Sequence, residues 1–166
     1  MKRNITFAAV ILIIMSGFFF ANYRIAEEKV LVIHSVEQNT EIIIPVPDRN
    51  FTVGFLHSVH KTPVCETFFI EDDNRLTLKD TRYSSLGVGM PYTDEGGAFI
   101  NDDGEFVLYF DRTYDFIPIR LSPIPEHSIE VGGETYQLLD FAKPNDRIDI
   151  SATDKWSLKT ISRKER

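Results

Sequence analysis

The sequence predicts a single all-β domain, an antiparallel sandwich or partly closed barrel, preceded by one N-terminal transmembrane helix. Short runs rich in β-branched and aromatic residues recur from residue 29 to residue 161, and turn-forming clusters separate them. No long stretch places apolar residues at the spacing of an amphipathic helix. A basic lead and an uncharged apolar run stand before all of these segments, which gives the chain one anchor and one domain.

The N-terminal segment has the order of a signal anchor, with Lys2 and Arg3 followed by an uncharged run over residues 5–21. That run is near the lower end of the ~17–25 residues that span a bilayer as a helix. The positive-inside rule keeps the N-terminus cytoplasmic and places the main domain outside the cytoplasm. Bulky Phe18, Phe19 and Phe20 stand where signal cleavage needs small residues, so we expect a retained single-pass anchor. The alternative is a cleaved signal peptide and a secreted domain.

Three segments follow from this order: an anchor over residues 1–23, an extracytoplasmic all-β domain over 24–162 and a basic tail over 163–166. Gly132 and Gly133 predict a two-residue turn that pairs Val131 with Glu134 and Ile129 with Tyr136. The expected strands cover residues 29–36, 40–47, 51–59, 64–71, 75–84, 98–101, 105–110, 114–121, 127–131, 134–139, 147–151 and 156–161.

The composition excludes several classes of function. The net charge of −7 and the pI of about 5.1 argue against a nucleic-acid partner, which normally meets a basic surface. One cysteine excludes both an internal disulfide framework and a cysteine-based zinc site. No phosphate loop or dinucleotide fingerprint is present, so we expect neither a cofactor nor a metal.

The stretch HSVHKTPVCETF, residues 57–68, gathers two histidines, a lysine, the single cysteine and a glutamate between two apolar runs. A hairpin that turns at Lys61 and Thr62 would place Val59 opposite Val64 and Phe55 opposite Phe68. The same register would place His57 directly opposite Glu66 on the inner face, while His60 would point away. A metal site using both histidines is disfavoured, because side chains three positions apart on a strand face opposite sides.

The predicted pair of His57 and Glu66 has two interpretations. Either it is a buried structural pair in which each group satisfies the other, or it lines a pocket and orients a ligand. Ser58 and Lys61 would lie at or near the tip of the same hairpin. Cys65 falls on the other face and is expected to be a packed residue.

A second candidate segment, SSLGVGMPY at residues 84–92, contains Gly87, Gly89 and Pro91. Two glycines let backbone N–H groups turn toward an anion, or let another strand approach closely. A tight crossover between strands is the favoured interpretation of the segment, because glycine generally marks turns. The candidate ligand-binding residues are therefore His57, Ser58, Lys61, Glu66, Ser85, Gly87, Gly89 and Pro91.

These two segments together resemble a small bacterial family, domain-of-unknown-function 1850. The resemblance rests on His57, Ser58, Val59, Lys61, Thr62, Pro63, Val64 and Glu66, followed by Ser85, Gly87, Gly89 and Pro91. It covers roughly residues 30–120. Members resemble short exported or membrane-anchored proteins, often encoded beside tripartite (TRAP) transporters of the TAXI type. The resemblance implies a transporter accessory role by association and carries no known chemistry.

We therefore expect a non-enzymatic accessory of a TRAP-type solute transport system. Its expected partners are the membrane, through residues 5–21, and the transporter subunit, the solute-binding protein or a small-molecule ligand. The alternatives are a hydrolase-like enzyme that uses His57 as a base oriented by Glu66, and a plain envelope interaction module.

The topology can be measured directly. A reporter fused after Arg166 should be active only outside the cytoplasm, because Lys2 and Arg3 hold the N-terminus inside. The protein should sediment with membranes and keep its N-terminal residues. A soluble product with a new N-terminus near Asn22 would contradict the anchor.

Overall fold

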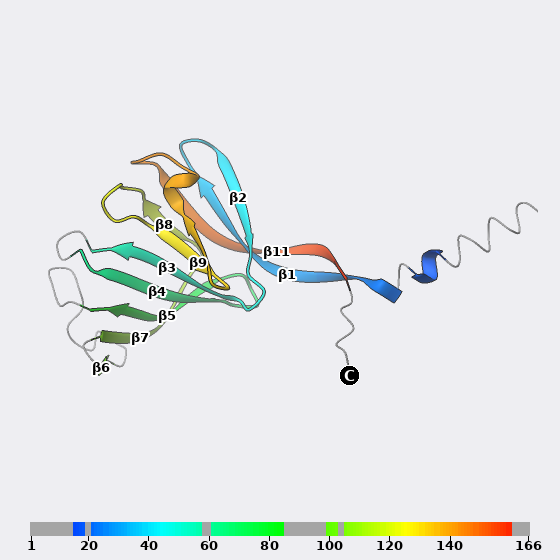
Figure 1. Ribbon diagram of the computed structural model, residues 1–166, viewed down its shortest axis with the longest axis horizontal. Helices are drawn as coiled ribbons and strands as arrows, with labels where there is room; N and C mark the ends of the chain where they lie inside the picture. Colours follow the sequence, from blue (N-terminus) through cyan, green and yellow to red (C-terminus); the bar gives the residue numbers. More distant parts are fainter. Residues whose placement is uncertain (1–14, 19–20, 58–60, 85–98, 103–104, 161–166) are drawn as a thin grey trace, which may run out of the picture. The chain divides into compact units, whose positions relative to one another are not determined.

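The computed structural model describes residues 15–18, 21–57, 61–84, 99–102 and 105–160 (Figure 1). One compact unit is Lys29–Asp154, and a second unit comprises Met1–Glu28 and Lys155–Arg166. Within the described ranges, no helix is both long enough and apolar enough to cross a membrane. Most of the predicted anchor over residues 1–23 lies outside those ranges.

From Tyr23 onward, the described chain forms two antiparallel sheets and one short 3₁₀ helix, η1. Four strands lie in the order β2-β1-β11-β8, and seven lie in the order β10-β9-β3-β4-β5-β7-β6. The strands are β1 (Tyr23–Ser35), β2 (Thr40–Pro45), β3 (Asn50–Leu56), β4 (Pro63–Ile70), β5 (Leu76–Tyr83), β6 (Phe99–Asp102), β7 (Glu105–Tyr114), β8 (Ile117–Arg120), β9 (Ser128–Val131), β10 (Glu134–Gln137) and β11 (Arg147–Thr160), and η1 is Leu138–Asp140.

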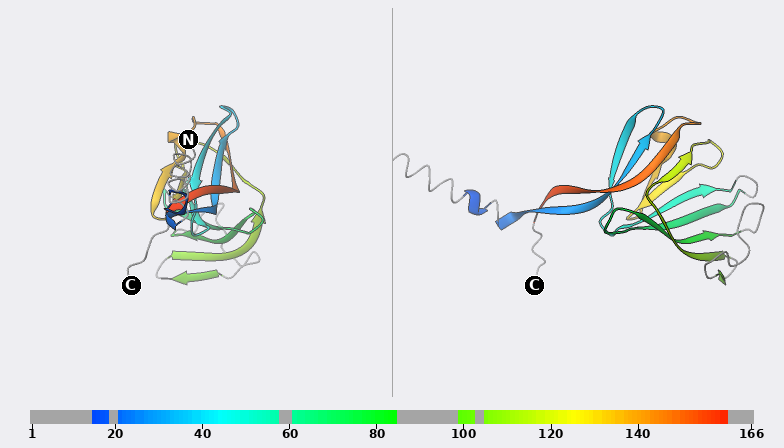
Figure 2. Two further views of the ribbon diagram at one scale, coloured as in Figure 1. Left: turned by 90° about the vertical axis from the view of Figure 1, so that its right-hand side faces the viewer. Right: turned by 180° about the vertical axis from the view of Figure 1, so that it is seen from behind.

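One hydrophobic core lies between the two sheets of the unit Lys29–Asp154. Leu31 and Ile33 from β1 and Ile148 from β11 share this core with Phe51 and Phe68 from the larger sheet. The rings of Phe51 and Phe68 stack with their centroids 5.3 Å apart. Figure 2 shows the two open sheets from further directions. The all-β prediction is confirmed, and alternate burial along the strands explains why both sheets form.

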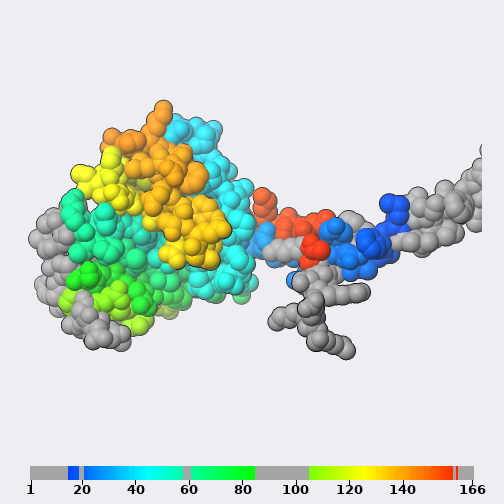
Figure 3. Space-filling model, viewed as in Figure 1, coloured from blue at the N-terminus to red at the C-terminus, as the bar shows by residue number. Residues whose placement is uncertain are grey.

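The hairpin predicted at Gly132 and Gly133 is confirmed. Strands β9 and β10 pair Val131 with Glu134 and Ile129 with Tyr136. Gly132 and Gly133 have φ of 59° and 85°, the left-handed backbone that this turn requires. In Figure 3 this hairpin and η1, yellow to orange, cover part of the visible face of the unit. Strands β6 and β7 likewise pair Asp102 with Glu105.

The predicted register of β3 and β4 is wrong. Val53 lies opposite Glu66 and Phe55 opposite Val64, so His57 does not face Glu66. The chain makes a longer loop than a two-residue turn. The N–H of His57 donates to the carbonyl of Thr62, and the N–H of Lys61 donates to the carbonyl of His57, both at 2.9 Å. Lys-Thr is a poor hairpin turn, and a shift by an even number of residues keeps every apolar side chain on the core face.

A buried lysine ties three distant segments together. Lys29 on β1 is 8% exposed. Its ammonium group lies 2.9 Å from the Asp154 carboxylate of β11 and donates to the Asn74 side-chain oxygen at 2.8 Å. It also donates to the carbonyl of Asp72 at 2.9 Å. The hydrogen bond from Lys29 is the main reason that the pKa of Asp154 is lowered. The β4–β5 turn is thereby fastened to the smaller sheet.

Lys29→Met should lower the free energy of unfolding by about 2 kcal/mol, because it leaves buried oxygen acceptors without a donor. The loss should shrink as the pH falls through the lowered pKa of Asp154, since the protonated carboxyl no longer gains from the lysine. The matched control is Lys79→Met, whose ammonium makes exposed ion pairs with Asp111 and Glu71. For the control, urea unfolding should show a loss of less than about 1 kcal/mol in the free energy of unfolding. Equal losses would contradict the assigned role of Lys29.

Candidate ligand-binding site

A cavity of about 280 Å³ opens between the two sheets of the unit Lys29–Asp154. Strands β3 and β4 form one wall, and all four residues of β8 form the facing wall. The segment before β9 completes the cavity. The lining residues are Val53, Phe55, Glu66, Ile117, Pro118, Ile119, Arg120 and His127. Most of them are apolar, with a few polar groups, as is usual for a small-molecule site.

Glu66 enters the cavity because of its place in β4. Alternate residues of a strand share one face, and Val64, Phe68 and Ile70 on the face of Glu66 are all buried in the core. Within the described residues, Glu66 makes no hydrogen bond and no ion pair. Burial raises the pKa of its carboxyl group, and no neighbouring charge offsets this effect. Glu66 is therefore an unpaired acid on the core face of a sheet.

His127 is the second polar group in the cavity, and the sequence analysis did not select it. Its ring lies 6.0 Å from the ring of Phe55, centroid to centroid. Its Nδ1 atom is buried and has no hydrogen-bond partner among the residues that the structure describes. Burial lowers the pKa of the imidazole, because the charged form loses its hydration. The sequence did contain a signal for an inward-facing His127. It stands two positions before Ile129 and four before Val131, which are both buried core residues on one face of the strand.

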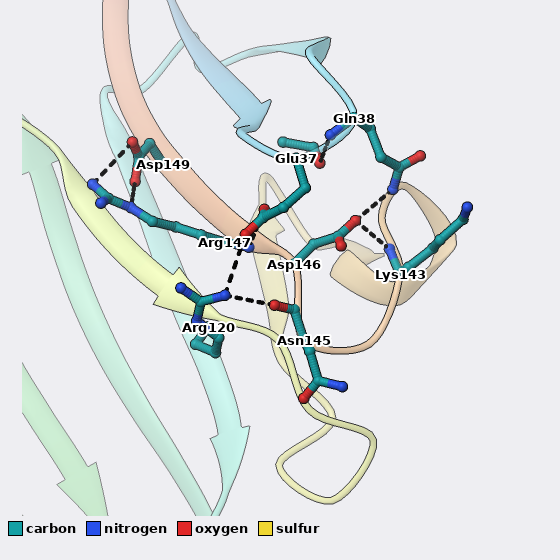
Figure 4. Close-up of polar contacts among 9 residues, drawn as sticks. Glu37, Gln38, Arg120, Lys143, Asn145, Asp146, Arg147 and Asp149 are labelled. Atoms are coloured by element: carbon teal, nitrogen blue, oxygen red, sulfur yellow. Dashed lines mark hydrogen bonds and ion pairs between the residues drawn. The ribbon is translucent and has the colours of Figure 1, made fainter.

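Arg120, at the end of β8, is held by groups outside the cavity (Figure 4). Its Nη1 atom donates to the carbonyl of Asn145 at 2.7 Å and to Glu37 Oε1 at 3.2 Å. The other carboxylate oxygen of Glu37 accepts the backbone N–H of Arg147 at 2.6 Å. Glu37 therefore balances the charge of Arg120 and joins the β1–β2 turn to β8 and β11.

Asp146 supports the same end of the sheet (Figure 4). One of its carboxylate oxygens accepts from Gln38 Nε2 at 2.7 Å and from the N–H of Lys143 at 3.0 Å. The hydrogen bond from Gln38 is the largest cause of its lowered pKa. The carbonyl of Asp146 accepts the N–H of Leu121, the residue after β8, at 2.9 Å. These bonds fix the strand that forms one wall of the cavity.

The structure places only some of the predicted site residues. Glu66 lines the cavity. His57 is buried just beyond β3, but it is not among the lining residues. Lys61 is exposed in the loop before β4. The remaining candidates lie outside the described residues: Ser58, Ser85, Gly87, Gly89 and Pro91. These residues, and the orientation of His60, stay predictions.

The polar side chains of the cavity are Glu66, Arg120 and His127. No serine, threonine or cysteine is among the residues that line it in the described part of the chain. Glu66 and His127 are two potential metal ligands, whereas zinc takes three or four from the protein. Across the described ranges, no group of three histidine, cysteine, aspartate or glutamate side chains is placed to hold a metal ion. The cavity therefore combines a mostly apolar lining with the paired Arg120 and with two groups, Glu66 and His127 Nδ1, that have no partner among the described residues.

The fold and the cavity define an all-β domain of two antiparallel sheets with a pocket between them. Residues 51–138 match the family described as a domain of unknown function (DUF1850), and the chain belongs to that family. The matched region runs from the second residue of β3 to the end of β10 and the first residue of η1, and it contains all the lining residues of the cavity. No curated protein and no solved structure matches the chain.

Glu66→Gln should stabilise the ligand-free protein, by about 1 kcal/mol at neutral pH, because it removes a desolvated charge from a binding site. The pKa of the Glu66 carboxyl is higher in the folded chain than the usual glutamate value. The free energy of unfolding therefore falls as the pH rises from the usual pKa through the raised one. The gain should therefore be absent in acid and grow across that pH window.

The matched control is Glu130→Gln, at an exposed position of β9. Its effect on the free energy of unfolding at neutral pH should stay within about 0.5 kcal/mol. If Glu66→Gln destabilises the protein at neutral pH, the carboxyl has a partner and the account of the cavity is wrong.

Proposed function

We propose that this protein binds a small molecule in the cavity between its sheets and acts as a non-enzymatic component of a solute transport system. The observation that carries the binding role is that Glu66 and the buried Nδ1 atom of His127 have no partner among the described residues, although both residues line a mostly apolar pocket. A buried polar group without a partner costs about 1–3 kcal/mol. Such groups are usual where a ligand supplies the missing hydrogen bonds.

The architecture around the cavity supports binding without chemistry. The end of the β8 wall is held by the bond of Arg120 to Glu37 and the bond of Leu121 to Asp146, so the cavity is shaped in advance. A preformed site loses little freedom on binding. The hydrolase alternative depended on His57 facing Glu66, which the strand register does not provide.

The proposed location is the outer face of a membrane, with residues 5–21 as the anchor. Support comes from the basic lead and the uncharged run. It also comes from exposed apolar and aromatic residues of the unit that comprises Met1–Glu28 and Lys155–Arg166. Ile25 is 71% exposed on β1, and Trp156 and Leu158 on β11 are 66% and 54% exposed. Tyr23 is also exposed. Tryptophan and tyrosine are enriched where proteins meet the lipid headgroups.

The transport context rests on the family resemblance. Small anchored proteins of this kind occur beside TAXI-type TRAP transporters, whose membrane subunit and solute-binding protein are the proposed partners. An accessory that binds a small molecule would sense or deliver a solute at the outer face of the membrane. A plain envelope interaction module, the alternative, would leave the cavity without an occupant.

Binding can be mapped by methyl NMR of the full chain in detergent, with a set of charged and neutral fragments. Fragments that enter the cavity should shift the methyl signals of Val53, Ile117 and Ile119. The exposed methyl groups of Val36 serve as an internal control. The absence of any cavity shift at millimolar fragment concentrations would contradict the proposed function.

A blocking variant gives a second measurement. Ile119→Trp places a large ring on the β8 wall and should abolish the fragment shifts of Val53. Ile43→Trp is the matched control, because Ile43 on β2 is 47% exposed and does not line the cavity. Both variants should keep the dispersed methyl spectrum of the folded domain. Undiminished binding in Ile119→Trp would place the fragments elsewhere.

A further inference from the structure

We infer that the ligand is a small organic cation with an apolar body, and that its ammonium group binds the Glu66 carboxylate while its apolar part contacts β3 and β8. This inference rests on the proposed function, since it assigns the chemical class of the molecule that the cavity takes. It follows from the charge, the hydrogen-bonding capacity and the size of the cavity.

The charge of the cavity is negative and uncompensated. Two charged residues line it, Glu66 and Arg120. Arg120 is neutralised by Glu37 at 3.2 Å and is also held by the carbonyl of Asn145. Glu66 has no such partner among the described residues. A cationic ligand would restore neutrality, whereas an anionic ligand would add a second unpaired charge to a desolvated site.

The other elements packed around Glu66 supply no competing charge. On β5 the residue opposite Glu66 is Thr81. Its neighbours Asp80 and Arg82 alternate onto the other face of the sheet and bond to each other at 2.9 Å. On β3 the residue opposite is Val53. The titratable and charged groups that share the cavity with Glu66 are therefore His127 and the neutralised Arg120.

The hydrogen-bonding capacity of the cavity points the same way. A carboxylate only accepts hydrogen bonds, and the Nδ1 atom of a neutral histidine accepts when the proton is on Nε2. An ammonium group has three N–H donors, so a single cation can satisfy both Glu66 and the orphaned Nδ1 of His127. Charge-assisted bonds of this kind are about twice as strong as neutral ones.

The walls set the size and the apolar character of the ligand. At roughly 30 Å³ for each water, a cavity of about 280 Å³ has room for roughly nine waters, or an organic ligand of similar size. Val53, Ile117 and Ile119 offer aliphatic contacts. The ring of Phe55 adds an aromatic face, which attracts cations as well as apolar groups.

Binding of such a cation must depend on pH in one direction. The raised pKa of Glu66 means that the free protein holds a proton there at pH values where an ordinary glutamate has lost it. A cation binds the ionised form, so affinity rises as the pH rises through that pKa. Protonation of His127 at lower pH adds a positive charge and acts in the same direction. A carboxylic acid or neutral ligand that binds protonated Glu66 would show the opposite trend.

The test compares three probes that share one ring: benzylammonium, benzyl alcohol and benzoate. The full chain in detergent is titrated with each probe, and the methyl signals of Val53, Ile117 and Ile119 are followed. Benzylammonium should bind at least tenfold more tightly than the other two at pH 7, and its affinity should fall as the pH is lowered. Glu66→Gln should remove this preference, while Glu130→Gln should keep it.

The outcomes separate this inference from the proposed function. If benzyl alcohol or benzoate enters the cavity as tightly as benzylammonium, the cationic ligand is overturned while binding in the cavity stands. The cationic ligand is also overturned, and binding in the cavity again stands, if benzylammonium binds Glu66→Gln as tightly as it binds the unchanged protein. If none of the three probes shifts the cavity signals, both the inference and the proposed function are contradicted.

Discussion

The burial of two apolar sheet faces against each other is the interaction on which the rest of this structure depends. Phe51, Phe68 and Ile129 of the larger sheet and Leu31 and Ile148 of the smaller one fill the space between the layers. This packing fixes which face of every strand points inward. It thereby carries Glu66 into the core face of β4, where a valine or phenylalanine would be expected. The cavity lies at the end of this interface, where β8 forms the facing wall.

The placement of Glu66 and His127 is costly for the ligand-free protein, and polar contacts elsewhere hold the structure around it. Lys29 fastens the β4–β5 turn to β11, and Glu37 and Asp146 hold the end of β8. Each of these groups is satisfied, in contrast to the two groups in the cavity. The contrast is informative, because proteins leave buried polar groups unpaired mainly where a partner arrives from outside. The pocket is a local exception within a well-paired framework.

The sequence predicted much of the fold and only part of the site. Gly132 and Gly133 predicted the β9–β10 hairpin because few residues tolerate their backbone angles. Alternation placed Glu66 on the core face, and that placement is confirmed. The β3–β4 register was predicted wrongly because registers that differ by an even number of residues bury the same apolar set, so only the loop distinguishes them. The contact of Arg120 with Glu37 joins residues too far apart in the sequence for any local pattern to pair them.

The central claim is that Glu66 is an unpaired acid in a pocket, and the titration of its own side chain tests this most directly. The carboxyl carbon of Glu66 can be followed by NMR in the ligand-free protein as the pH is varied. We expect a midpoint clearly above the usual pKa of a glutamate side chain, because burial disfavours the charged form and no charge among the described residues compensates. A midpoint at or below that usual value would show that the carboxylate is hydrated or paired, and would contradict the unpaired acid.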